Sequence, residues 1–185
     1  MAVEQFNLPT NQRAERKLLI TVAEWTPDGA TSPEREILGT RTEDSSIEYN
    51  ADISTSTDIR GINYTDVNKT QPQQDFDPYL VLGGSKLGAF LNDIRMRNAL
   101  SELSQFTIYI ITAYVGSAEK GYRAERHTDC TIAFNSLGGD TNVNFPISVY
   151  LSNVDNTSSA TAALGHAGLG TVDKLGDDFV FTLDV

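Results

Sequence analysis

The sequence has little of what catalytic and covalent sites are built from. Its 185 residues include one cysteine, one tryptophan and two histidines. A lone cysteine, Cys130, excludes an intramolecular disulfide, and two histidines with one cysteine cannot build a Cys/His zinc site. We therefore expect no catalytic residue, no metal and no cofactor. The low cysteine content is typical of proteins from a reducing cytoplasm.

Positive charge and long apolar runs are also scarce. Lys and Arg number 14 against 25 Asp and Glu, so the net charge is -11. A negative field repels phosphates, which argues against general binding to nucleic acid or to an anionic membrane. The longest apolar stretch, 106–115, is well short of the ~20 residues that span a bilayer. Residues 1–11 lack the basic start and apolar run of a secretion signal, so we expect a protein kept inside its cell or released by lysis.

The length fits one domain with an arm. Residues 1–15 are polar with scattered apolar positions and are predicted to be an N-terminal arm. Residues 16–185 are predicted to form a single β domain. Within it, residues 153–176 are rich in Ser, Thr, Ala and Gly, which predicts a loop or an insertion.

Alternating polarity is the clearest signal of secondary structure. From 46 to 58 apolar or Thr positions alternate with Ser, Asn, Asp and Glu, which predicts a long half-buried strand, or a strand bent once, with an acidic polar face. A turn at Arg60 and a return strand at 62–67 would complete a hairpin, and the polar segment 66–74 reads as a loop. Further strands are predicted at 17–25, 36–40, 105–115, 122–134, 145–151 and 179–185.

One helix is predicted over 85–97, with Ser85 as its N-cap. Its apolar stripe at i, i+3, i+4 and i+7 consists of Leu87, Phe90, Leu91 and Ile94. The order of elements is strands, one helix, then strands. This order predicts a mainly β fold, a β-sandwich or half-barrel with one flanking α-helix.

No catalytic or binding motif is complete. The segment 83–86 resembles a phosphate loop, but Ser85 separates the glycines from Lys86. The segment beginning at Asp140 resembles a calcium loop, but Phe145 stands where the turn requires glycine. On a regular strand His127 and Cys130 point to opposite faces, so pairing them would need a bulge. We expect that the protein is not an enzyme.

Several segments carry a family resemblance through their joint order. The first is the run EDSSIEYNADISTSTDIRGINYTDVNKTQPQQDFDPY, followed by LGGSKLG and QFTIYIITAYVG. The later HTDCTIAFNSLGGD and GTVDKLGDDFVFTLDV fit the same pattern. In these segments the chain resembles the major tail (tail tube) proteins of long-tailed phages and prophages of Gram-positive bacteria. The resemblance extends over most of the chain, roughly residues 15–185.

The resemblance implies a phage tail-tube-like β subunit, six of which close into a homo-hexameric ring. Rings stack into a tube through arms and a long loop or hairpin. The tube encloses the tape-measure protein and meets distal tail and tail-terminator proteins at its ends. DNA passes through in transit without being bound specifically, and no membrane is involved. The implied location is the virion tail, assembled in the cytoplasm of the bacterial host.

Two surfaces follow as hypotheses. The acidic face of the strand 46–58 suits a tube lumen, because negative charge lets DNA slide rather than stick. Its lumen-facing residues are predicted to be Glu48, Asn50, Asp52 and Asp58. The segment 26–44 is predicted to be the inter-ring stacking loop, with Pro27, Asp28, Pro33, Glu43 and Asp44 as its contact residues.

Three other functions remain open from the sequence. A tail terminator or another single-ring head–tail protein would share the fold and stop at one ring. A carbohydrate-binding β-sandwich would be a monomer with a cluster of exposed aromatic rings, and Trp25 as the only tryptophan counts against it. A hydrolase on a β scaffold has no supporting motif.

Overall fold

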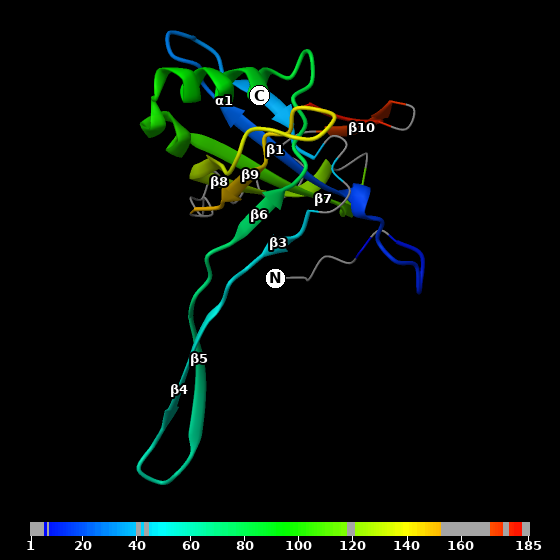
Figure 1. The fold of residues 1–185 in the computed structure, drawn as a ribbon. Helices are drawn as coiled ribbons and strands as arrows, with labels where there is room; N and C mark the ends of the chain where they lie inside the picture. The colour runs from blue at the N-terminus through cyan, green and yellow to red at the C-terminus, as the bar shows by residue number, and fades with distance from the viewer. Residues whose placement is uncertain are drawn as a thin grey trace. The chain divides into compact units, whose positions relative to one another are not determined.

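The computed structural model describes residues 6, 8–39, 42, 45–117, 121–152, 171–175 and 178–182. These residues form a mainly β protein with one α-helix, which confirms the predicted fold class (Figure 1). An antiparallel sheet has the strand order β2-β1-β7-β8-β9-β6-β3, and β4-β5 and β10-β11 form two further pairs. The chain divides into two compact units, 1–38 with 105–128 and 153–185, and 39–104 with 129–152.

In the first unit, strand β1 (Leu19–Trp25) lies between two antiparallel partners, β2 (Glu34–Ile37) and β7 (Phe106–Ser117). A short 3₁₀ helix, η1 (Arg16–Leu18), precedes β1. Strand β7 is covered on both faces in its middle part, because the successive residues from Ile108 to Ile111 are all buried.

Strands β10 (Thr171–Leu175) and β11 (Asp178–Thr182) pair antiparallel near the end of the chain. The predicted strand 179–185 is confirmed over the part that the structure describes. The predicted loop 153–176 is wrong at its end, because residues 171–175 form β10. Residues 153–170 lie outside the described part of the chain.

In the second unit, the later part of β8 (Gly121–Phe134) pairs with β9 (Ile147–Tyr150). Strand β9 pairs with β6 (Gln73–Phe76), which pairs with the two-residue strand β3 (Ile47–Glu48). One face of these strands is deeply buried; it includes Phe76, Ile132, Ile147 and Val149, each at most 1% exposed. This face supplies much of the apolar core of the unit.

Helix α1 (Lys86–Arg97) starts and ends where its sequence dictates. The Ser85 hydroxyl accepts a hydrogen bond from the Gly88 amide at 2.9 Å, which confirms the predicted N-cap. Asn98 takes a left-handed conformation (φ +55°) and ends the helix. The predicted stripe is buried at Leu87, Leu91 and Ile94, while Phe90 is partly exposed. Within the described residues, no helix is long and apolar enough to cross a membrane.

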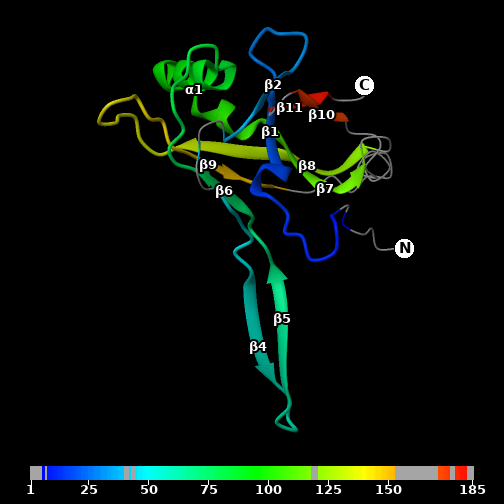
Figure 2. The same cartoon turned by 90° about the vertical axis from the view of Figure 1, so that its right-hand side faces the viewer.

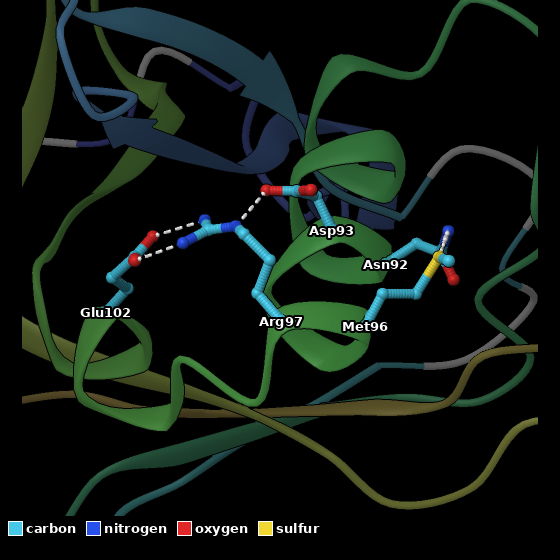
Figure 3. A network of polar contacts seen from close by, with 5 residues as sticks. All are labelled: Asn92, Asp93, Met96, Arg97 and Glu102. Carbon is cyan, nitrogen blue, oxygen red and sulfur yellow. Dashed lines mark hydrogen bonds and ion pairs between the residues drawn. The ribbon is translucent and has the colours of Figure 1, made fainter.

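A guanidinium fork ties the end of α1 to the 3₁₀ helix that follows, η2 (Leu100–Ser104). Arg97 donates from Nε to Asp93 Oδ2 at 2.7 Å and from both terminal nitrogens to Glu102 at 2.9 and 3.0 Å (Figure 3). These hydrogen bonds hold the pKa of Glu102 below its ordinary value. The bidentate pair joins the last turn of α1 to η2.

The predicted strand 46–58 is divided, which matches the alternative of one bend. After β3 the chain breaks at Asn50, whose φ is +43°, and resumes as β4 (Asp52–Thr57). Every residue of β4 is exposed, so the prediction of half-burial is wrong for this part. Strand β5 (Asn63–Lys69) confirms the predicted return strand, whereas the predicted loop 66–74 is wrong where β5 and β6 occupy it.

Candidate assembly surfaces

The β4–β5 hairpin is a two-stranded sheet with solvent on both faces. Its strands pair only with each other among the described elements, and both views show it extending away from β3 and β6 (Figures 1 and 2). The register sets Ile53 opposite Val67 and Thr55 opposite Thr65. These four β-branched side chains therefore share one face of the hairpin.

The hairpin segment exposes an unusual concentration of large apolar side chains. They are Tyr49, Ile53, Ile59, Ile62, Tyr64 and Val67. Ile59, at the tip, is 105% exposed. Apolar groups gathered in this way mark an interaction surface, and a lone two-stranded hairpin is marginally stable in water. Burial of these side chains against another surface would stabilise the hairpin.

Asp58 organises the turn at the tip of the hairpin. Its Oδ1 accepts hydrogen bonds from the backbone amides of Arg60 (2.8 Å) and Ile62 (2.9 Å), and its Oδ2 accepts one from the Tyr64 hydroxyl (3.3 Å). The hydrogen bond from Ile62 is the main cause that lowers the pKa of Asp58. A carboxylate that bonds the next amides along the chain is a turn-forming group. Asp58 therefore stabilises the turn at the hairpin tip, a role that the sequence analysis did not predict for it.

Asn50 holds the base of the hairpin. It tolerates the left-handed conformation better than most residues, and its side-chain amide donates to the Gln71 carbonyl at 3.2 Å. The Gln71 amide in turn donates to the Tyr49 carbonyl at 3.0 Å. These two contacts join the two legs of the hairpin where they leave the sheet.

The four predicted lumen residues do not share one strand face. Glu48 lies on the sheet, where the register aligns it with Gln73, Tyr150 and Thr131 across β3, β6, β9 and β8. All four side chains are at least partly exposed, on the face opposite the buried core. Asp52 begins the hairpin, while Asn50 and Asp58 lie at its base and tip. The lumen assignment stays a prediction. Of the four predicted lumen residues, Glu48 is the one that lies on the β3–β6–β9–β8 sheet.

The predicted stacking segment 26–44 is also divided. Pro27, Asp28 and Pro33 lie in the loop between β1 and β2, where the Pro27 carbonyl accepts the Ala30 amide at 2.9 Å. Strand β2 then interrupts the segment. Glu43 and Asp44 lie outside the described residues. Since no large apolar side chain is exposed in this loop, its stacking role stays a prediction without a further observation behind it.

A second apolar surface, which the sequence did not reveal, lies in the second unit. It consists of Val81, Leu137 and Val143, each about half exposed, and is called here the loop patch. The Val81 amide donates to the Val143 carbonyl at 3.1 Å, and one step along the Phe145 amide donates to the Tyr79 carbonyl at 2.8 Å. Because Tyr79 and Phe145 are buried, the apolar surface continues from the core to solvent at this point.

A tight turn supports the loop patch. Gly138 and Asn144 exchange backbone hydrogen bonds across it. Gly139 has a φ of +143°, and a Cβ there would lie 1.9 Å from the Asn142 carbonyl oxygen, so the turn requires glycine. The turn exposes Asp140. Residues 140–144 thus belong to a turn that precedes β9.

His127 and Cys130 are both buried, at 4% and 0% exposure. The burial pattern of β8 shifts by one residue at Asp129, whose φ is +55°. Parity alone did not predict this shift. The Cys130 sulfur accepts a hydrogen bond from the Ser152 amide at 3.5 Å. Burial of this kind is typical of a core cysteine rather than of an accessible nucleophile.

The described residues offer neither an exposed tryptophan nor a cluster of metal ligands. Trp25 is 3% exposed and packs against Phe106 with ring centroids 6.4 Å apart, so it offers no platform for a sugar ring. Among the residues that the structure describes, no group of three or more His, Cys, Asp or Glu could hold a metal ion. No protein-family model matches the chain, and a search of curated proteins gave no match.

Proposed function

We propose that this chain is a self-assembling tail tube protein of a long-tailed phage or prophage. Hexameric rings stack into a tube that encloses the tape-measure protein and conducts DNA at infection. The β4–β5 hairpin is the observation that carries the proposal. The exposure of the hairpin supports contact with another molecule, and the sequence resemblance supports a stack of hexameric rings as the assembly.

The hairpin cannot draw its stability from its own subunit. Fixing one backbone residue costs about 1–2 kcal/mol, and every side chain of β4 and of residues 63–67 in β5 is exposed. Burying one Ile or Val side chain contributes about 1.5–3 kcal/mol. The apolar side chains of this segment can offset the ordering cost only against another molecule. A protein that stacks copies of itself supplies that surface in every subunit.

The charge distribution supports a conduit. The net charge is -11, and Glu48 lies on the exposed face of the β3–β6–β9–β8 sheet. A wall of such faces repels the phosphates of DNA and so does not retain the polymer. The other residues aligned with Glu48 on this face are Gln73, Tyr150 and Thr131, none of which is basic.

Negative-stain electron microscopy of the purified, concentrated protein tests the proposal. Hollow tubes with a regular axial repeat are expected. A variant in which residues 52–69 are replaced by Asn-Gly keeps the Tyr49–Gln71 contact at the base and should give folded subunits without tubes. Deletion of residues 27–33 is the matched control, because it shortens the other predicted stacking loop.

Each outcome has a clear meaning. Tubes formed by the 52–69 variant at the wild-type concentration would contradict the role given to the hairpin. Loss of tubes only in the 27–33 deletion would move stacking to the β1–β2 loop, as the sequence alone predicted. Single rings of the wild-type protein that never stack would indicate a terminator. Monomers at every concentration, together with binding to a glycan, would replace the proposal by a carbohydrate-binding module.

A further inference from the structure

The tip of the hairpin and the loop patch are two different surfaces with matching character. The tip projects Ile59, which is fully exposed, beside Ile62 and Arg60. The loop patch exposes Val81, Leu137 and Val143 beside buried core residues. We propose that the hairpin tip of one subunit docks on the loop patch of a second copy of this chain. This inference rests on the proposed self-assembly and names its acceptor surface.

The apolar match is the first argument. Within the described residues the tip presents the most exposed large apolar side chain, Ile59. The loop patch offers aliphatic side chains next to the buried residues Tyr79 and Phe145. Backbone hydrogen bonds anchor it, from Val81 to Val143 and from Phe145 to Tyr79. A rigid acceptor loses little entropy on binding, which favours docking there over docking on a free loop.

Charge gives the second argument. The Arg60 side chain is 72% exposed, and its Nε lies 3.7 Å from Asp58, whose oxygens already accept other hydrogen bonds. The loop patch is flanked by two exposed acids, Asp77 and Asp140, and Asp140 has no ion pair within the described residues. Arg60 therefore meets opposite charge at this surface.

Another exposed apolar pair of the second unit consists of Met96 (72% exposed) and Leu100 (52% exposed). The two nearby bases, Arg95 and Arg97, are balanced by two acids, Asp93 and Glu102, both of which pair with Arg97. This surface offers Arg60 no excess of negative charge, whereas the loop patch exposes Asp77 and Asp140. Charge therefore favours the loop patch as the acceptor.

The contact is head-to-tail, because tip and patch are distinct parts of the same chain. Such a contact leaves a free tip and a free patch at every step. It closes a ring or propagates a filament, whereas a self-complementary contact stops at a dimer. One contact of this kind is therefore sufficient for polymer growth.

Cysteine cross-linking in the full-length protein tests the inference. Ile59→Cys and Val143→Cys are made in separate chains, mixed, assembled and oxidised mildly. The native Cys130 is fully buried, and the wild-type protein, oxidised in the same way, measures any cross-linking through it. A disulfide-linked dimer is expected from the mixture and from neither variant alone. Ile59→Cys mixed with Met96→Cys is the matched control and should give none.

Charge reversal provides a second readout. Arg60→Asp or Asp140→Arg alone should raise the critical concentration for assembly about 5-fold, and one chain carrying both changes should return to within about 2-fold of the wild type. Tubes without the Ile59–Val143 cross-link, or tip-to-tip links in the Ile59→Cys variant alone, would overturn the docking site and leave the proposed function standing. Absence of any assembly in the wild type would overturn both.

Discussion

Replacing Ile59 by serine should weaken assembly without weakening the subunit. Ile59 is 105% exposed, so its side chain contributes no burial to the isolated fold. Surface changes of this kind alter the free energy of unfolding by less than about 0.5 kcal/mol. In the assembled state the same side chain is expected to be buried against a neighbouring copy. The two effects can therefore be separated by measuring both on one variant.

The magnitude follows from the burial of one isoleucine. Full burial of an Ile side chain contributes about 1.5–3 kcal/mol, and about 1.4 kcal/mol corresponds to tenfold in an equilibrium constant. Ile59→Ser should therefore raise the critical concentration for assembly about 10- to 100-fold. Sedimentation velocity across a concentration series measures this quantity, and urea unfolding of the dispersed subunit measures stability.

Two control variants separate an effect on assembly from an effect on subunit stability. Met96→Ser removes another exposed apolar side chain, at 72% exposure, outside the proposed contact and should leave the critical concentration unchanged. Leu91→Ala, at a fully buried position, should cost about 2–5 kcal/mol of subunit stability. An unchanged critical concentration for Ile59→Ser, or a loss of subunit stability above 1 kcal/mol (roughly twice the surface range), would refute the reasoning.

Three further predictions concern the fold. Ser85→Ala removes the side-chain cap of α1 and should lower the free energy of unfolding by about 1 kcal/mol in urea titration. Gly139→Ala should cost about 1–3 kcal/mol because its Cβ would collide with the Asn142 carbonyl, whereas Gly138→Ala, where a Cβ meets nothing within 4 Å, should cost much less in the same assay. The Asp58 pKa is lowered, so its stabilisation of the hairpin tip is present above its ordinary value of 3.8 and is lost as pH falls through the lower folded value. NMR titration of the Arg60 and Ile62 amides, which donate hydrogen bonds to Asp58, should give a midpoint below 3.8, and a midpoint at 3.8 would contradict the turn assignment.

Local rules in the sequence were sufficient for the helix and for the central strands. The Ser85 cap and the apolar stripe predict α1, because both depend on groups within a few residues of each other. The two-sided apolar run of β7 predicts burial on both faces for the same reason. The sequence D-I-R-G at 58–61 could also have been read as a turn that Asp58 begins, because an Asp with a Gly three residues later is typical of a turn.

Solvent exposure was not readable from the same patterns. Alternation over 46–58 shows that the two faces of a strand differ, but it does not show that either face is covered. The structure divides this run at Asn50 and leaves β4 exposed on both faces. The predicted lumen residues were consequently distributed over a sheet, a hairpin base and a hairpin tip. The loop patch was missed because Leu137 and Val143 are single apolar residues between polar or glycine neighbours. Val81 lies in the apolar run 79–82, which does not show by itself which of its side chains is exposed.

The sequence by itself determined the mainly β class, the position of the one helix and the acidic character of the chain. Each depends on local periodicity or on a sum over residues. Only the tertiary structure decided which apolar side chains stay in solvent, because that depends on pairing between segments far apart in the chain. The register of β4 with β5 and the contact of Val81 with Val143 are such pairings. They create the surfaces from which an assembly function is proposed.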